Sequence, residues 1–144
     1  MILFDSSVVI DARDPDSPFH DWAKHQIATA VQEGGEGGVV NAIVVSEASV
    51  RAENRDAVPA LLESLGLKLV PLPISAAVPA AKAFAVYLDR LKKEGRRHEH
   101  RVPLPDFLIG AHAKADGMKL VTRDPVRVRT YFPDIQLITP QAAL

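Results

Sequence analysis

The chain has 144 residues, a formal net charge of −1, 47% hydrophobic residues and no cysteine. This length predicts a single domain, residues 1–144, with its own core; the balanced charge excludes an overall positive field for nucleic acid, and the lack of cysteine excludes disulfides and thiolate metal sites. Because no apolar run approaches the roughly 20 residues that cross a bilayer, and Asp5 interrupts the apolar N-terminus, we expect a cytoplasmic protein outside the membrane.

The first half of the chain alternates short apolar runs with helical patterns. The expected elements, in chain order, are a strand at 2–4, a helix at 8–12 capped by Ser6 and Ser7, a helix at 19–31, a strand at 39–40 and a helix at 43–50. Residues 43–50 fit a helix because their apolar side chains fall on one helical face, although β-branching favours a strand. The first strand, entirely apolar, is expected to be central and buried on both faces.

The second half continues the alternation. It predicts a helix at 56–65, an edge strand at 67–72, a helix that Ser75 caps and that runs to residue 91, a helix at 105–115, a strand at 119–122, a helix at 126–131 and a strand at 135–138. The helix that follows Ser75 should bury Val78, Ala81, Phe84, Ala85, Leu88 and Leu91. The helix at 105–115 should pack through Leu104, Phe107, Leu108, Ala111 and Ala115, and its His112 should be partly exposed.

Short strands separated by helices predict an α/β fold. Parallel neighbours need crossover connections, so we expect an α/β/α sandwich with a central, mostly parallel sheet of about five short strands. Functional sites in such sheets lie at the C-terminal ends of the strands. Asp5 and Asp124 follow two of the predicted strands, which places both carboxylates at that edge.

Four acidic side chains attract attention at this edge. Asp5 and Asp124 can each cap a helix, and Asp106 in a first helical turn complements the helix dipole, so each has an ordinary structural explanation. Glu47 shares a helical face with Ile43, Val44 and Val50, and neither capping nor solvation explains a glutamate there.

Convergence of these four carboxylates would need a cation. Two charges about 4 Å apart repel by about 4 kcal/mol at an effective dielectric constant near 20. Mg²⁺ or Mn²⁺ removes this repulsion and prefers oxygen ligands. Ions with open water positions generate hydroxide and hold a phosphodiester for in-line displacement, so the predicted chemistry is phosphodiester hydrolysis.

The same segments resemble the four motifs of PIN-domain nucleases, and their order and spacing are most similar to VapC-type toxins of type II toxin–antitoxin pairs. The segments are Ile2-Leu3-Phe4-Asp5-Ser6-Ser7, Val45-Ser46-Glu47, Pro103-Leu104-Pro105-Asp106-Phe107-Leu108-Ile109 and Leu120-Val121-Thr122-Arg123-Asp124. The resemblance implies an Mg²⁺- or Mn²⁺-dependent endoribonuclease, an RNA substrate and a cognate antitoxin that blocks the site. It further implies that Asp5, Glu47, Asp106 and Asp124 are the catalytic and metal-binding acids, and that Ser6, Ser7 and Thr122 orient carboxylates or water.

Two basic segments are candidate RNA-binding sites. Residues 92–101 hold five basic and two acidic side chains, among them Arg96, Arg97 and Arg101. They either hold phosphates beside Asp106 or form a solvated loop after a helix, where cations are favoured. The second group, Arg123, Arg127 and Arg129, fits either RNA or acidic residues of an antitoxin.

Other interpretations remain open from the sequence. The protein could be a catalytically inactive PIN-fold module that binds RNA or protein, or a phosphotransferase with Asp5 as nucleophile. His98 and His100 have zinc-like spacing but no third positioned ligand. The edge strand at 67–72 and the helix at 76–91 either form a homodimer interface or belong to the core.

Overall fold

Five parallel strands form the central sheet of this computed structural model, which describes residues 1–32, 37–97 and 101–141. The sheet order is β3-β2-β1-β4-β5, and the strands are β1 (Ile2–Phe4), β2 (Gly38–Asn41), β3 (Leu67–Val70), β4 (Lys119–Val121) and β5 (Leu137–Ile138). All four neighbouring pairs are parallel. The predicted sheet is therefore confirmed, with β1 at its centre and β3 at an edge.

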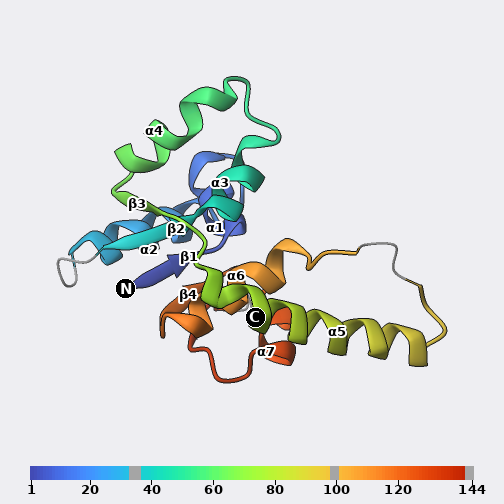
Figure 1. The fold of residues 1–144 in the computed structure, drawn as a ribbon. Coiled ribbons are helices and arrows are strands. Elements are labelled where there is room, and N and C mark those ends of the chain that lie inside the picture. Colours follow the sequence, from blue (N-terminus) through green and yellow to red (C-terminus); the bar gives the residue numbers. More distant parts are fainter. Residues whose placement is uncertain (33–36, 98–100, 142–144) are drawn as a thin grey trace.

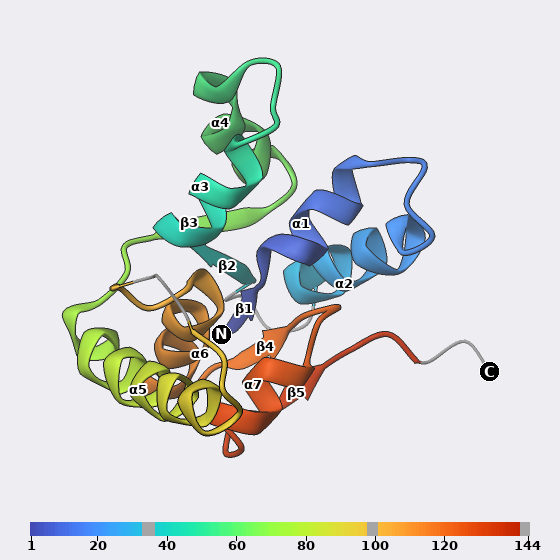
Figure 2. The same cartoon turned by 90° about the vertical axis from the view of Figure 1, so that its right-hand side faces the viewer.

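Helices make the crossover connections between the strands (Figure 1). They are α1 (Ser6–Arg13), α2 (His20–Gln32), α3 (Ala42–Ser49), α4 (Val58–Ser64), α5 (Ala77–Lys93), α6 (Pro105–Ala115) and α7 (Val126–Tyr131), with 3₁₀ turns at Arg55–Ala57 and Ile74–Ala76. Helices α1 and α2 lie on the opposite side of the sheet from α5 and α6 (Figure 2). The predicted α/β/α sandwich is confirmed. Within the described residues, none of the helices is both long and apolar enough to cross a membrane.

The core explains why the strands are short and apolar. Leu3 and Phe4 of β1 and Val39 and Val40 of β2 are fully buried, because helices cover both faces of the sheet. Gly110 allows α6 to approach the C-terminal segment closely, since a Cβ there would lie 2.7 Å from the Phe132 ring. This packing fixes the position of α6 and of the acid in its first turn.

Three helix-level predictions are wrong in their details. Helix α5 buries Ala80, Ala83, Phe84 and Leu91, while the predicted core positions Val78, Ala81 and Ala85 are exposed, because an alanine-rich helix offers more than one apolar stripe. Helix α6 contacts α5 and also the sheet, so it buries Ile109, Ala113 and His112 while Ala115 is exposed. Ser75 lies inside the 3₁₀ turn that leads into α5 and does not cap the helix.

Candidate metal centre at the strand ends

Asp5 follows β1 directly and is held by its neighbours. It caps α1, where its Oδ1 accepts the Ser6 backbone N–H at 2.8 Å. Its Oδ2 accepts the hydroxyls of Ser7 at 3.0 Å and Thr122 at 2.8 Å. The residue is only 8% exposed. Asp5 itself, and not Ser6 or Ser7, is therefore the N-cap, and the two serine hydroxyls turn towards acidic side chains.

Glu47 reaches the same region from α3. The side chain of Asn41 caps this helix by accepting the Val44 N–H at 3.0 Å. The Ser6 hydroxyl donates to Glu47 Oε1 at 2.9 Å and lies 3.5 Å from Asp5 Oδ1, so it joins the two carboxylates. Glu47 is half-buried, but Val50 is 61% exposed, so the predicted shared apolar face does not extend to Val50.

Asp106 and Asp124 complete the acidic set from the other side. Asp106 lies in the first turn of α6, and its Oδ2 is 3.3 Å from Arg127 Nη1. The Asp124 backbone N–H donates to the Thr122 hydroxyl at 3.0 Å. Because Pro125 occupies the N-cap position of α7, the capping explanation of Asp124 is wrong, and its side chain is exposed.

Neighbouring negative charges help to raise the pKa values of Glu47 and Asp106. Burial raises the pKa of Glu47, the Ser6 hydrogen bond opposes this, and the charges of Asp5 and Asp106 add to the rise. Burial likewise raises the pKa of Asp106, and Asp5 and Asp124 add to it while Arg127 opposes it. Glu47 therefore feels the charges of Asp5 and Asp106, and Asp106 those of Asp5 and Asp124, while the predicted meeting of all four carboxylates at one ion stays a prediction.

The donor chemistry of this space fits a hard divalent cation. Its side chains offer carboxylate and hydroxyl oxygens, which Mg²⁺ and Mn²⁺ prefer. In the described part of the chain, however, no three His, Asp or Glu side chains are spaced to enclose one ion. Asp106 instead contacts a guanidinium through its Oδ2, so a cation bound at that oxygen would compete with Arg127.

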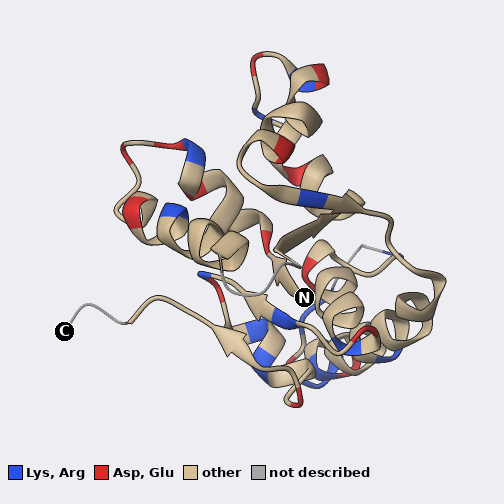
Figure 3. Cartoon of the chain, turned by 90° about the vertical axis from the view of Figure 1, so that its left-hand side faces the viewer, with Lys and Arg blue, Asp and Glu red and all other residues tan. Residues whose placement is uncertain are grey.

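A cavity of about 610 Å³ adjoins the acids. Asp106 and Asp124 lie on its wall together with Arg90, Arg123 and Arg127. Lys and Arg of α7 and of the C-terminal half of α5 lie on the same side of the molecule (Figure 3). Of the predicted basic residues, the structure thus brings Arg123 and Arg127 to the acids, and it adds Arg90, which no local pattern indicated.

The other predicted cations lie outside this cavity. Arg96 is 3.6 Å from Glu94 and lines a separate cavity of about 200 Å³. Arg97 and Arg101 are exposed, and neither lines the 610 Å³ cavity. Their role in RNA binding stays a prediction. His98 and His100 lie outside the described residues.

An ion pair behind the site was missed by the sequence reasoning. Arg123 Nε lies 2.6 Å from Oδ2 of the buried Asp11, without the alignment of a hydrogen bond. Asp11 Oδ1 accepts the Ser17 hydroxyl at 2.9 Å, and the Arg123 guanidinium lies 5.2 Å from the Phe19 ring centroid. This contact ties the turn that carries Asp124 to α1. A charged residue inside the apolar run of α1 was the available signal.

A second buried network joins the helices that carry Glu47 and Asp106. Asn41 uses its Oδ1 to cap α3, so its Nδ2 donates to His112 Nδ1 at 3.0 Å. His112 Nε2 then donates to Asp116 at 3.1 Å. His112 is 2% exposed, so the prediction that it is partly exposed is wrong. Its hydrogen bonds in the core satisfy the polar ring.

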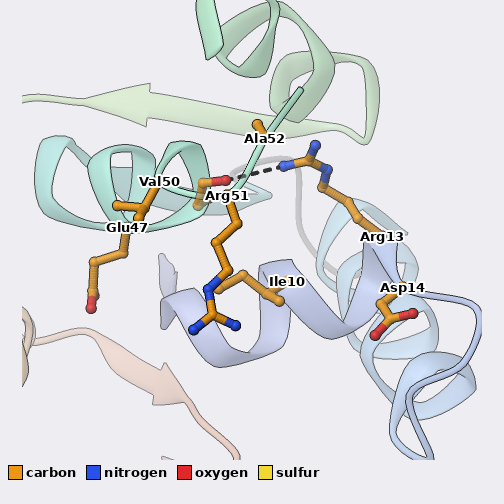
Figure 4. A pocket seen from close by; sticks show the side chains of 8 residues that line it. Ile10, Arg13, Asp14, Glu47, Val50, Arg51 and Ala52 are labelled. Atoms are coloured by element: carbon orange, nitrogen blue, oxygen red, sulfur yellow. Dashed lines mark hydrogen bonds between the residues drawn. The ribbon is translucent and has the colours of Figure 1, made fainter. Parts of the chain in front are cut away.

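Another cavity, of about 580 Å³, lies on the far side of Glu47 between α1 and α3 (Figure 4). Ile10 and Val50 give it exposed apolar surface, and Arg13 and Arg51 give it positive charge. Arg13 donates to the Ala48 carbonyl at 3.4 Å, while Arg51 extends towards Ile10. Asp14 and Glu47 also line this cavity, so its charged side chains balance, whereas arginines outnumber acids in the 610 Å³ cavity.

Comparison with known proteins agrees with this architecture. The chain is similar in structure to VapBC2 from Rickettsia felis bound to a promoter DNA fragment (TM-score 0.66, 15% identity, 96% of this chain and 98% of that chain covered) and to FitAcB from Neisseria gonorrhoeae (TM-score 0.65, 20% identity, 99% and 100% covered). It is also similar to Mycobacterium tuberculosis VapC20, described as a toxin that cleaves the sarcin-ricin loop (TM-score 0.60, 18% identity, 94% and 99% covered). Among curated proteins, no sequence gives a significant match.

A family model gives the assignment. The model of the PIN domain matches residues 2–132, which include all four acids of the strand-end cluster. The five-stranded parallel sheet and the helices on both of its sides agree with that match. The chain therefore belongs to the PIN-domain family.

Proposed function

We propose that this protein is a metal-dependent endoribonuclease and the toxin of a toxin–antitoxin pair, acting in the cytoplasm. The observation that supports it most is the hydrogen-bonded arrangement of Asp5 and Glu47 at the strand ends, which the Ser6 hydroxyl joins, with Asp106 near enough for its charge to raise the pKa of Glu47. Similarity of fold to VapBC2, to a toxin–antitoxin complex from Klebsiella pneumoniae and to a toxin that cleaves the sarcin-ricin loop adds support.

The four acids would hold Mg²⁺ or Mn²⁺, with Asp5 and Asp106 as the principal ligands. A bound ion of this kind supplies hydroxide from water and neutralises charge on the attacked phosphodiester. Ser6, Ser7 and Thr122 keep the carboxylates oriented, because each hydroxyl donates to Asp5 or Glu47. Arg123 and Arg127 hold phosphates of the RNA beside the acids.

The cavity between α1 and α3 is the surface that we assign to the antitoxin. It offers Ile10 and Val50 to apolar side chains and Arg13 and Arg51 to acidic ones, directly beside Glu47. A partner seated there would block access to the acids. Co-expression with the product of an adjacent short reading frame should suppress RNA cleavage, and Arg51→Glu should weaken this suppression. Unchanged suppression would contradict this assignment.

We also propose a homodimer that uses α5 and the turn before it. Ile74, Val78 and Val86 are 89%, 61% and 59% exposed, an apolar surface that water disfavours. Val78→Lys should shift the mass measured by light scattering towards the monomer, whereas Val102→Lys, at another exposed valine, should not. A monomeric parent protein would contradict the proposal.

The nuclease proposal is tested by substitution of Asp5. Purified protein freed of antitoxin should cleave single-stranded RNA with Mg²⁺ or Mn²⁺ and not with EDTA. Asp5→Asn should reduce the rate of RNA cleavage about 100-fold or more, because it removes a metal ligand itself and not a neighbouring residue that only orients a ligand. Asp21→Asn, an exposed acid on α2, is the matched control. RNA binding without metal-dependent cleavage would favour the alternative, a catalytically inactive PIN-fold binding module.

A further inference from the structure

Arg127 lies where the acids of the centre meet the basic cavity. Its Nη1 is 3.3 Å from Asp106 Oδ2, and its guanidinium carbon is 5.2 Å from the Tyr87 ring centroid and 5.6 Å from that of Phe107. The ring centroids of Tyr87 and Phe107 are 5.4 Å apart, and both rings also contact Tyr131. Two rings thus form a platform under one cation, and Tyr131 packs against both of them.

The platform and the carboxylate constrain Arg127 differently. Ring faces attract a guanidinium over a range of orientations, so the cation can turn and keep this attraction. The side chains of Arg127 and Asp106 are 36% and 40% exposed. Exposed ion pairs of this kind contribute no more than about 1 kcal/mol to stability. Loss of the Asp106 contact therefore does not release the arginine from the site.

The cavity offers Arg127 a second type of partner. Arg90 and Arg123 lie on the same wall as Arg127, so three guanidinium groups and the two carboxylates of Asp106 and Asp124 line a space of about 610 Å³. A planar guanidinium binds phosphate oxygens with the same fork of N–H groups that it offers to a carboxylate. A phosphate in this space would therefore compete with Asp106 for Arg127.

We infer that Arg127 is an exchangeable counter-ion: it occupies Asp106 before the divalent ion binds, and moves to an RNA phosphate in the cavity lined by Arg90 and Arg123 when the ion takes that carboxylate. This inference rests on the proposed nuclease function and specifies how its two ligands are coupled. Metal and RNA each remove one partner of the Arg127–Asp106 pair, so each must favour binding of the other. Arg127 would thus limit metal binding in the absence of substrate.

The first test is Mn²⁺ titration by calorimetry without RNA. Arg127→Gln should bind Mn²⁺ about fivefold more tightly than the parent, because no cation competes for Asp106. Arg129→Gln removes the same charge from α7 at a side chain outside the cavity and should change the affinity much less. Equal or weaker Mn²⁺ binding by Arg127→Gln, or an equal effect of Arg129→Gln, would overturn the inference.

The second test measures RNA binding in EDTA, where no cleavage occurs. Asp106→Asn frees Arg127, so a labelled single-stranded RNA should bind more tightly to it than to Asp124→Asn, which removes the same charge from the same cavity. When Arg127→Gln is added, Asp106→Asn and Asp124→Asn should have equal effects. A difference that persists without Arg127 would overturn the inference.

These tests separate the inference from the proposed function. If the parent binds Mn²⁺ through Asp106 and Arg127→Gln leaves the affinity unchanged, the exchange is wrong and the nuclease proposal stands. If the predicted changes in Mn²⁺ and RNA affinity are seen but no metal-dependent cleavage occurs, the exchange stands and the nuclease proposal is wrong. If neither the parent nor Arg127→Gln binds Mn²⁺, both are wrong.

Discussion

Asp5 and Asp106 bring the same chemical group to the same end of the sheet, but the chain holds them in different ways. Asp5 is 8% exposed and accepts hydrogen bonds from the Ser6 backbone and from the hydroxyls of Ser7 and Thr122. Asp106 is considerably more exposed, and its carboxylate is 3.3 Å from the guanidinium of Arg127.

This difference separates a permanent part of the centre from an adjustable one. A buried carboxylate is tolerated only when donors satisfy it, and the donors of Asp5 come from its own helix and from the neighbouring strand end. Asp106 is partly buried, and its carboxylate is stabilised by the Arg127 guanidinium and by water at its exposed part. We therefore expect substitutions around Asp5 to affect folding, and substitutions around Asp106 to affect ligand binding.

The largest expected effect on stability concerns the ion pair of Asp11 and Arg123, next to Asp5. Asp11→Ala leaves Arg123 mostly buried without its counter-ion, and we expect a loss of about 2–3 kcal/mol, less than for a fully buried pair because Arg123 is about one-third exposed. Urea unfolding would measure it. The double variant Asp11→Ala with Arg123→Met should recover part of the loss, and a loss of the same size in the double variant would refute this explanation.

A smaller effect is expected at Thr122. Thr122→Val removes a donor to Asp5 Oδ2 and the acceptor of the Asp124 N–H, so the free energy of unfolding should fall by about 1–2 kcal/mol. Thr122→Ser retains the hydroxyl and should lose much less.

Asp106→Asn, on the adjustable side, should change the free energy of unfolding by about 0.5 kcal/mol or less. If Asp106→Asn proves more destabilising than Thr122→Val, the comparison of the two sides is wrong.

The smallest effect concerns pH. Because the pKa of Glu47 is raised, the folded protein holds this proton more tightly than the unfolded chain does. The metal-free protein should therefore lose stability as the pH rises from the ordinary value of 4.5 through the raised pKa. Glu47→Gln keeps an acceptor for Ser6 and should be about 0.5 kcal/mol more stable than the parent at neutral pH.

Melting temperatures measured across this pH range, with and without Mg²⁺, would show both trends. Saturating Mg²⁺ should stabilise the parent more than Glu47→Gln, since an ion that binds only the folded state stabilises it by mass action. A parent protein whose stability rises through the same pH range would contradict the raised pKa of Glu47.

Much of the fold was predictable because the strands and most helices are local patterns. The run 2–4 and the helix over Val126–Tyr131 were predicted with the bounds that the structure shows. The places of the candidate acids in the fold were predictable as well, since each follows a strand or lies in a helix, while their metal-binding role stays a prediction. The faces of α5 and α6 were not, because alanine suits both a buried and an exposed position and only the neighbouring helices choose between them.

The amino-acid sequence by itself determined the alternation of strands and helices and the four acids placed in its motifs, because hydrophobic period and helix-start chemistry act over a few residues. Only the tertiary structure decided which groups those acids meet. Thr122 reaches Asp5 across 117 positions and Arg127 reaches Asp106 across 21. Contacts over such separations depend on strand order and helix packing, which no local pattern encodes, and they distinguish the permanent side of the centre from the adjustable one.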